Sequence, residues 1–219
     1  MMTDTIRHHL PDDLLMAYAA GSLPEAFSLL VATHLSMCDR CRAAAESYDA
    51  VGGALLEDVP EAAMSEASLA ATLAMLQAPD PKPARRAKTR DSAFTLPQPL
   101  ADYAGSRLSD IRWRPVGMGV KQAILRTSRT ATARMMHIPP GVAMPDHGHH
   151  GMEMTLVLDG AFSDAFGLYR AGDIAVADAS VDHVPVATDD KACLCVIAAD
   201  ARLRFNSLIP RLLQPLLRI

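Results

Sequence analysis

The sequence has few aromatic residues and no long apolar run. Aromatic side chains make up 5% of the 219 residues. No apolar stretch approaches the roughly 20 residues that a membrane-spanning helix needs, so we expect no membrane association. Residues 1–7 lack the apolar segment of a secretory signal peptide. Together these absences indicate a cytoplasmic protein.

The chain also has few cysteines and a small net charge. The chain has four cysteines and a net charge of −4 at pH 7. Thiols stay reduced in the cytoplasm, which excludes structural disulfides and leaves metal ligands, core residues or redox sensors. The small negative charge argues against a general nucleic-acid-binding protein, so we expect no direct contact with nucleic acid.

Charge and proline are unevenly distributed along the chain. Residues 1–78 carry three arginines against eleven acidic residues, a balance of −8. Residues 79–99 hold five of the fifteen prolines, with three arginines and two lysines. Proline stiffens such a segment and charge extends it. The sequence therefore predicts a helical domain over 1–78, a linker over 79–94 and a second domain over 95–219.

The first domain shows helical periodicity. Apolar residues recur at spacings of three and four, and the predicted helices cover residues 12–20, 27–35, 44–56 and 69–76. Ser22 and Glu25 have the spacing of a capping box before the second helix. So small an all-α bundle has little core, and a bound zinc ion would supply missing stability.

The apolar period changes from 3.6 to 2 in the second domain. Short candidate strands, separated by glycine and proline, cover residues 122–127, 131–138, 154–158, 174–177, 192–198 and 202–206. Many short strands at this spacing indicate a sandwich or barrel, most simply a jelly roll. The predicted fold class is therefore a small all-α bundle followed by an all-β barrel.

A compact H-x-x-x-C-x-x-C motif is formed by His34, Cys38 and Cys41. On one helix these three side chains would lie on a single stripe. Imidazole and thiolate are the ligands that zinc prefers. His8 and His9, upstream, are the candidates for a fourth ligand that would close a structural site. The alternative is a pair of buried thiols beside a surface histidine.

A second group of candidate ligands lies in residues 141–160, which read G-x5-H-x-H-x3-E-x6-G. His147 and His149 are two apart, so on a strand they face the same side. Glu153 follows on the next strand, and His183 can supply a third imidazole. Three histidines and a glutamate suit zinc, manganese, iron or nickel. The alternative is a set of surface histidines around a glycine turn.

Three other residues have weaker claims to a functional role. His150 is a candidate ligand only through its place in the turn. Cys193 and Cys195 would share one face of a strand, and we expect both to be small apolar core residues. The alternative for these two thiols is a redox sensor near the second metal site.

The two ligand groups together resemble those of the ChrR-type anti-sigma factors, which join a zinc-binding anti-sigma domain to a C-terminal cupin. The first half matches through the 14–21 run and through His9, His34, Cys38 and Cys41. The second half matches the first cupin motif through His147, His149 and Glu153. The second cupin motif is degraded, because residues 178–182 replace the usual Pro-x-Gly before His183.

This resemblance implies a regulator and not an enzyme. Family members bind an extracytoplasmic-function (ECF-type) sigma factor and keep it from RNA polymerase, with the helical domain packed between the two sigma domains. The cupin is implicated in the response to singlet oxygen or related oxidants, after which the sigma factor is released. The implied cofactors are zinc in the first domain and zinc or another divalent metal in the cupin. The alternatives are a metal-dependent cupin enzyme of the dioxygenase or isomerase type, with a helical regulatory domain, and a metal-storage protein.

Overall fold

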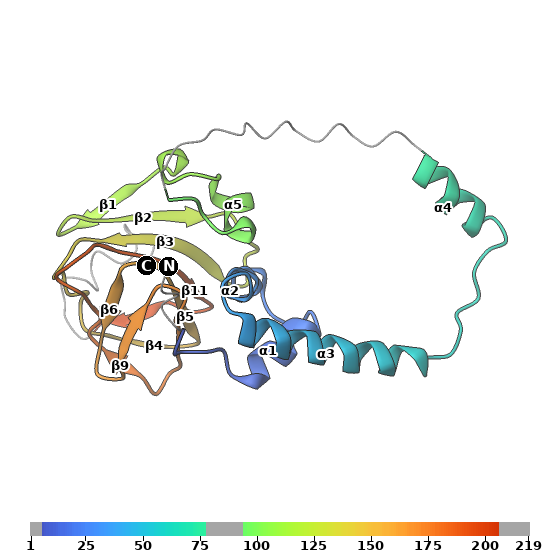
Figure 1. Ribbon diagram of the computed structural model, residues 1–219, viewed down its shortest axis with the longest axis horizontal. Coiled ribbons are helices and arrows are strands. Elements are labelled where there is room, and N and C mark those ends of the chain that lie inside the picture. Colours follow the sequence, from blue (N-terminus) through green and yellow to red (C-terminus); the bar gives the residue numbers. More distant parts are fainter. Residues whose placement is uncertain (1–5, 78–93, 206–219) are drawn as a thin grey trace.

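A helical region and a β region make up the part of the chain that the structure, a computed structural model, describes (Figure 1). That part consists of residues 6–77 and 94–205. The helices are α1 (Asp12–Ala19), α2 (Glu25–Leu35), α3 (Asp39–Glu57), α4 (Ser68–Gln77) and α5 (Gln98–Ala104), followed by the short 3-10 helix η1 (Leu108–Asp110). The all-α character predicted for the first domain is confirmed, whereas α5 was not predicted.

The β region consists of antiparallel strands that curl into a barrel (Figure 1). The strands are β1 (Arg114–Gly117), β2 (Val120–Leu125), β3 (Thr132–Ile138), β4 (His147–His149), β5 (Glu153–Asp159), β6 (Ala161–Ser163), β7 (Leu168–Arg170), β8 (Ile174–Ala177), β9 (Asp182–His183), β10 (Val186–Ala187), β11 (Cys193–Ala199) and β12 (Leu203–Phe205). The sheet orders over the described residues are β1-β2-β3-β11-β5-β8, β10-β6-β7 and β12-β4-β9.

The helix starts follow simple local rules, with one correction. α1 begins after Pro11, and Asp12 and Asp13 in its first turn stabilise the positive end of the helix dipole. The chain turns at Gly21, whose φ of 66° suits glycine. The predicted capping box does not form: Pro24 occupies the N-cap of α2, and the Ser22 hydroxyl donates to the Ala17 carbonyl.

The H-x-x-x-C-x-x-C motif spans a break between two helices and not one helical stripe. α2 ends at Leu35, and Cys38 is the N-cap residue of α3, in an extended conformation. The Cys38 sulfur accepts the backbone N–H of Cys41 at 3.5 Å. His34 therefore comes from the end of α2 and Cys41 from the first turn of α3.

The largest sheet is buried on both faces at its central strand, β11. On β11, Cys193 and Cys195 face the barrel interior, in a cluster with Val157. Leu194 and Val196 point to the opposite face. Alternation of this kind follows from the period of two along a strand. The outer face of the sheet is thus apolar and needs a cover.

Helix α2 provides that cover. Its Phe27 and Leu30 are fully buried and belong to one apolar cluster with Leu156 and Val196 of the sheet. At the far end of the interface, the Glu25 carboxylate accepts hydrogen bonds from the Tyr103 hydroxyl at 2.8 Å and from the backbone of Ser128. The helical and β regions therefore share one hydrophobic core.

The shared core bears on how the two predicted domains meet, and the predicted boundaries between them are a separate matter. Residues 78–93, which include nearly all of the predicted linker at 79–94, lie outside the described residues. The division at 1–78 and 95–219 stays a prediction, and the shared core shows only that the two sides are in contact.

The second half of the helical region is exposed. Helix α4 has no buried residue, and the last buried residue of α3 is Ala45. The end of α3 and the whole of α4 extend away from the β region (Figure 1). We define the exposed helical face by its apolar side chains, each at least 48% exposed: Val51, Leu55, Leu56, Leu69, Leu73, Met75 and Leu76. Apolar side chains exposed in this number are available for contact with another protein. Among the described residues, no helix is both long and apolar enough to cross a membrane.

Candidate metal centres

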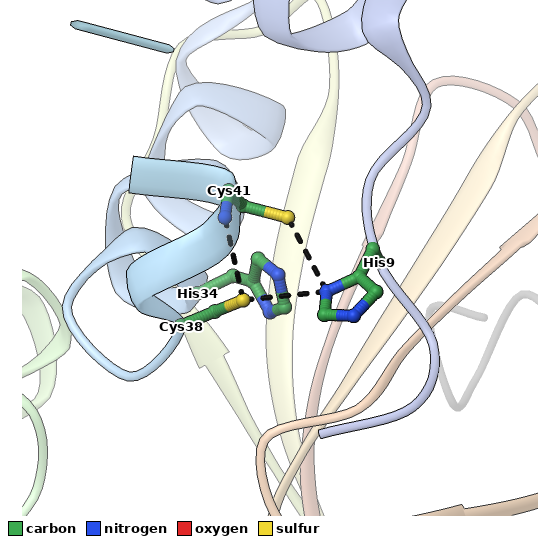
Figure 2. A group of neighbouring side chains, drawn as sticks. All are labelled: His9, His34, Cys38 and Cys41. Atoms are coloured by element: carbon green, nitrogen blue, oxygen red, sulfur yellow. Dashed lines mark hydrogen bonds between the residues drawn. The ribbon is translucent and has the colours of Figure 1, made fainter. Parts of the chain in front are cut away.

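The first ligand group lies at the junction of the helices with the β region (Figure 2). Each of its four residues offers a ligand atom, and these atoms lie within 4.8 Å of one another. The group consists of His9, His34, Cys38 and Cys41. The Nδ1 atom of His9 lies 3.3 Å from the Cys38 sulfur and 3.6 Å from the Cys41 sulfur. The arrangement matches the donor set of a structural zinc site.

The structure also distinguishes His9 from His8. His9 lies on the extended segment before α1, and its ring points at both sulfurs (Figure 2). The ring of His8 instead packs against Tyr169 of the β region, with ring centroids 4.3 Å apart. The geometry thus brings His9 to the group and turns His8 away from it.

The protonation of this group suits a metal ion. His34 is fully buried and its Nδ1 lies 3.0 Å from the Gly172 carbonyl, so Nδ1 carries the proton and donates it. The lone pair of His34 Nε2 is then free, and that atom has no hydrogen-bond partner within the described ranges. Burial lowers the pKa of His34 to about 4, which keeps the ring neutral. Burial raises the pKa of Cys41 to about 11, so a bound cation is needed to favour its thiolate.

The second ligand group lies inside the β region. His147, His149, Glu153 and His183 are buried, and their ligand atoms also lie within 4.8 Å of one another. β4 places both His147 and His149, and β9 pairs His183 directly opposite His147. Glu153 is the first residue of β5. The three ring centroids lie between 4.7 and 5.3 Å apart.

Hydrogen bonds fix the tautomers of two histidines in this group. Nδ1 of His147 lies 2.7 Å from the Pro145 carbonyl, and Nδ1 of His183 lies 2.8 Å from a carboxylate oxygen of Asp164. Metal-binding histidines in proteins show the same arrangement, with the second nitrogen turned to the metal. Nε2 of His149 and of His183 are buried without a hydrogen-bond partner among the residues described. These unpartnered atoms fit a metal ion at the centre of the group.

A mostly apolar cavity adjoins the second group. Met136, Met144 and Phe162 line it, together with the buried guanidinium of Arg134. Burial raises the pKa of Glu153 to about 7, although the positive charge of Arg134 lowers it in part. Ionising a buried carboxylate is costly, and a nearby metal cation would offset that cost and stabilise the charged form of Glu153.

The remaining candidates take no part in either group. His150 is exposed in the turn between β4 and β5. Cys193 and Cys195 are buried, and Cys195 lines the cavity. The pKa of Cys195 is raised by its hydrogen bond with Cys193 and by burial. Reactive thiols have lowered pKa values, so this environment favours core residues over a redox pair.

Three comparisons with known proteins bear on the whole chain. A family model described as the ChrR Cupin-like domain matches residues 103–201. The anti-sigma-E factor ChrR of Cereibacter sphaeroides is 57% identical over 217 residues, which cover 98% of this chain and 100% of that protein. The chain belongs to the ChrR family of anti-sigma factors. The crystal structure of Rhodobacter sphaeroides SigE in complex with the anti-sigma ChrR is 54% identical, with a TM-score of 0.78, over 90% of this chain and 100% of that chain.

Membership of the ChrR family confirms the resemblance inferred from the two ligand groups and the predicted fold class. The β region is a cupin-like domain, and the helical region carries the His/Cys group. The two groups could each hold a metal ion.

Sequence reasoning missed the residues that orient the ligands. Asp164 faces His183, and the carbonyl of Gly172 faces His34. Asp173 is buried and binds the segment that carries His9. Asp173 is far in sequence from the ligands it supports, so no local spacing marks it. The only sequence signal for this role is the Gly172-Asp173 pair directly before β8, and that pair predicts no more than a turn.

Proposed function

We propose that this protein is an anti-sigma factor that binds an ECF-type sigma factor through its helical region and withholds it from RNA polymerase. The observation that carries this proposal is the near-complete match to ChrR, a chain that has been crystallised with SigE. Because RNA polymerase acts in the cytoplasm, we place this protein there.

The surface of the helical region supports the proposal. The exposed helical face offers apolar side chains on α3 and α4, outside the core shared with the sheet. Residues 1–78 also carry a balance of −8. Such charge speeds and steers the encounter with a basic, polymerase-facing surface, while apolar contacts supply most of the affinity.

The first ligand group is proposed as a structural zinc site. Its ligands are His9, His34, Cys38 and Cys41, and two thiolates among four donors favour zinc. The ion would join the segment before α1 to the ends of α2 and α3. It would thereby fix the start of α3, the helix that leads to the exposed helical face.

The second ligand group is proposed as the sensing site. His147, His149, Glu153 and His183 would hold zinc or another divalent metal beside the cavity. Nitrogen and oxygen donors next to an apolar cavity allow a small oxidant or its product to reach the metal. We propose that singlet oxygen or a related oxidant acts here and that the sigma factor is then released. The protein is proposed to be a regulator without catalytic activity.

A cupin enzyme is the second candidate, favoured by one observation. The buried Arg134 lies in the cavity with the ligand Glu153 and could orient an anionic substrate. The wall around it is mainly methionine and aliphatic side chains, with few polar groups to fix a substrate. Turnover of a small carboxylate by the metal-loaded protein, independent of any sigma factor, would favour the enzyme.

Co-purification tests the anti-sigma proposal directly. The full chain is co-expressed with the sigma factor encoded beside its gene, and the complex is captured through a tag on the sigma factor. Leu55→Asp/Leu73→Asp places charge on the exposed helical face and should abolish capture, because charge opposes apolar contact with the sigma factor. Both side chains are at least 48% exposed, so the substitutions should leave the fold intact.

A matched control places the same charge on exposed apolar surface elsewhere. Met118 is 71% exposed in the β1–β2 turn, and its φ of 50° suits aspartate. Met118→Asp should leave capture unchanged. Equal capture of all three proteins would remove the exposed helical face from the account, and no capture of the wild type would reject this sigma factor as the partner.

A further inference from the structure

The turn between β7 and β8, residues 170–173, lies against the first ligand group although it belongs to the cupin. Its Gly172 carbonyl accepts a hydrogen bond from His34 Nδ1 at 3.0 Å. This bond sets the tautomer of His34 and aims Nε2 at the ligand group. One ligand of the helical region is therefore oriented by the cupin backbone.

The same turn also holds the segment that carries His9. Asp173 is 2% exposed, and its Oδ1 accepts the backbone N–H groups of Arg7 at 2.7 Å and His8 at 2.9 Å. The backbone N–H of Ile174 donates to the His8 carbonyl at 3.3 Å. The other carboxylate oxygen of Asp173 accepts the N–H of Arg170 at 2.9 Å and so closes the turn itself. A single buried carboxylate thus connects the His9 segment to the cupin.

The close approach of the two regions requires glycine at position 172. Its φ is 92°, and a Cβ atom there would lie 2.7 Å from the side chain of Ile6. The backbone N–H of Gly172 donates to the Val157 carbonyl on β5 at 2.8 Å. β5 begins with Glu153 of the second ligand group, and Ala177 of β8 pairs with Glu153. The turn is therefore attached to the strands at the second ligand group.

We infer that the β7–β8 turn of the cupin is a positioning element of the first metal site, with Asp173 holding the His9 segment and Gly172 orienting His34. The affinity of the helical region for its metal then depends on how the cupin holds this turn. A shift of β5 and β8 at the second ligand group has a direct path to two ligands of the first. This inference deepens the proposed function, since it rests on a metal at the first site but not on sigma binding.

The inference predicts the size of the effect on metal affinity and an equal effect of the metal on the turn. Groups that orient metal ligands typically contribute about 10- to 100-fold in metal affinity. If the turn strengthens metal binding, metal binding must stabilise the turn by the same factor. Both directions can be measured on the full chain without any sigma factor.

The first experiment uses Asp173→Asn. The amide keeps the shape of the carboxylate, but its single oxygen cannot serve both Oδ1 and Oδ2 acceptor roles. Cobalt is bound first, because its thiolate charge-transfer absorption reports only the site with Cys38 and Cys41, and zinc is then titrated against it with a chelator as buffer. We expect a roughly 10- to 100-fold loss of zinc affinity at this site.

Asp178→Asn is the matched control. Asp178 is another turn aspartate of the cupin, between β8 and β9, and its Oδ1 accepts the backbone N–H and the hydroxyl of Ser180. These two hydrogen bonds stay within the turn. Zinc affinity at the thiolate site should stay within about threefold of wild type in this variant. An Asp173→Asn affinity equal to that of Asp178→Asn overturns the inference.

A second experiment keeps Asp173 and so decides the matter even if Asp173→Asn does not fold. Amide hydrogen exchange of a His147→Ala variant, in which a ligand of the second site is removed, is compared before and after zinc loading. Exchange at residues 170–174 should slow on loading, and exchange at 164–167 should not. Unchanged exchange at 170–174 contradicts the inference, while absence of any cobalt–thiolate absorption rejects the first metal site itself.

Discussion

The two ligand groups each contain four residues whose ligand atoms lie within 4.8 Å of one another, yet they are built differently. The first takes sulfur and nitrogen donors from three chain segments that meet at the edge of a small helical region. The second takes nitrogen and oxygen donors from strands β4, β5 and β9 of a barrel with its own core. Folding of the first group's surroundings should therefore depend on its metal far more than folding of the barrel does.

Surroundings distinguish the two groups as clearly as ligands do. The first is covered by helices on one side and by the β7–β8 turn of the cupin on the other, and four protein ligands would close it. The second adjoins a cavity lined by Met136 and Phe162. A closed site serves structure, whereas a site beside a cavity can meet a small molecule. The difference supports the proposal that the helical region holds the sigma factor and the cupin senses the oxidant.

The largest expected effect is that of removing both thiols from the first group. Cys38→Ser/Cys41→Ser should lose one zinc per chain, because two of four ligands become weak donors. Structural zinc contributes on the order of 10 kcal/mol to the folding of small domains, so α1–α3 should lose protection against proteolysis. Elemental analysis with limited proteolysis measures this. Retention of thiolate–cobalt absorption by the variant would show that the cysteines are not ligands.

A smaller effect separates the two N-terminal histidines. His9→Ala should weaken zinc binding at the first group, because the His9 ring faces both sulfurs. His8→Ala should bind zinc nearly as well as wild type, because its ring packs on Tyr169. Competition with a chromophoric chelator compares the pair. If His8→Ala loses zinc while His9→Ala retains it, the assignment is wrong.

A pH-dependent effect of a few kcal/mol is expected at the second group. Burial raises the pKa of Glu153 from 4.5 to about 7, so its stability contribution is present below pH 4.5 and is lost as pH rises through 7. In chelator-treated protein at pH 8, the free energy of unfolding of Glu153→Gln should therefore exceed that of wild type by up to about 3 kcal/mol. At pH 4 the two free energies of unfolding should be equal. Urea unfolding at both pH values measures the difference.

Metal should reverse the sign of that effect. Added zinc should stabilise the wild type at pH 8 and should stabilise Glu153→Gln much less, because an amide is a weaker ligand than a carboxylate. Equal stabilisation of both proteins would contradict a role for Glu153 as a ligand.

The smallest effect is expected from the second pair of cysteines. Cys193→Ser/Cys195→Ser should leave the oxidant response of the sigma factor largely intact, because both thiols are buried core residues. A transcription reporter before and after exposure to singlet oxygen measures this. Complete loss of induction in a variant with normal thermal stability would restore the redox-sensor alternative.

Local spacing in the sequence was enough to find both ligand groups, because each lies mainly within one short segment. Local spacing left His8 and His9 open and only the family resemblance named His9, since neighbouring residues on an extended segment point in opposite directions and spacing does not say which one faces the group. Asp173 could not be found, because it acts on residues more than 160 positions away.

The packing of α2 on the sheet was missed for a different reason. Its buried residues are spread around the helix and not confined to one stripe: Ala26, Phe27, Leu29, Leu30, Val31, Thr33 and His34. A helix that is apolar on most sides is buried on most sides. This pattern was visible in the sequence and argues against separable modules, whereas the proline-rich segment argues for them.

The division of labour between the two groups is tested most directly by a transcription reporter driven by the sigma factor, read with and without singlet oxygen. The account predicts that Cys38→Ser/Cys41→Ser gives high expression under both conditions, because the sigma factor is no longer held. It predicts that His147→Ala or Glu153→Ala gives low expression under both conditions, because holding persists and sensing is lost. Normal induction in the cupin variants, or loss of their repression in unstressed cells, would contradict it.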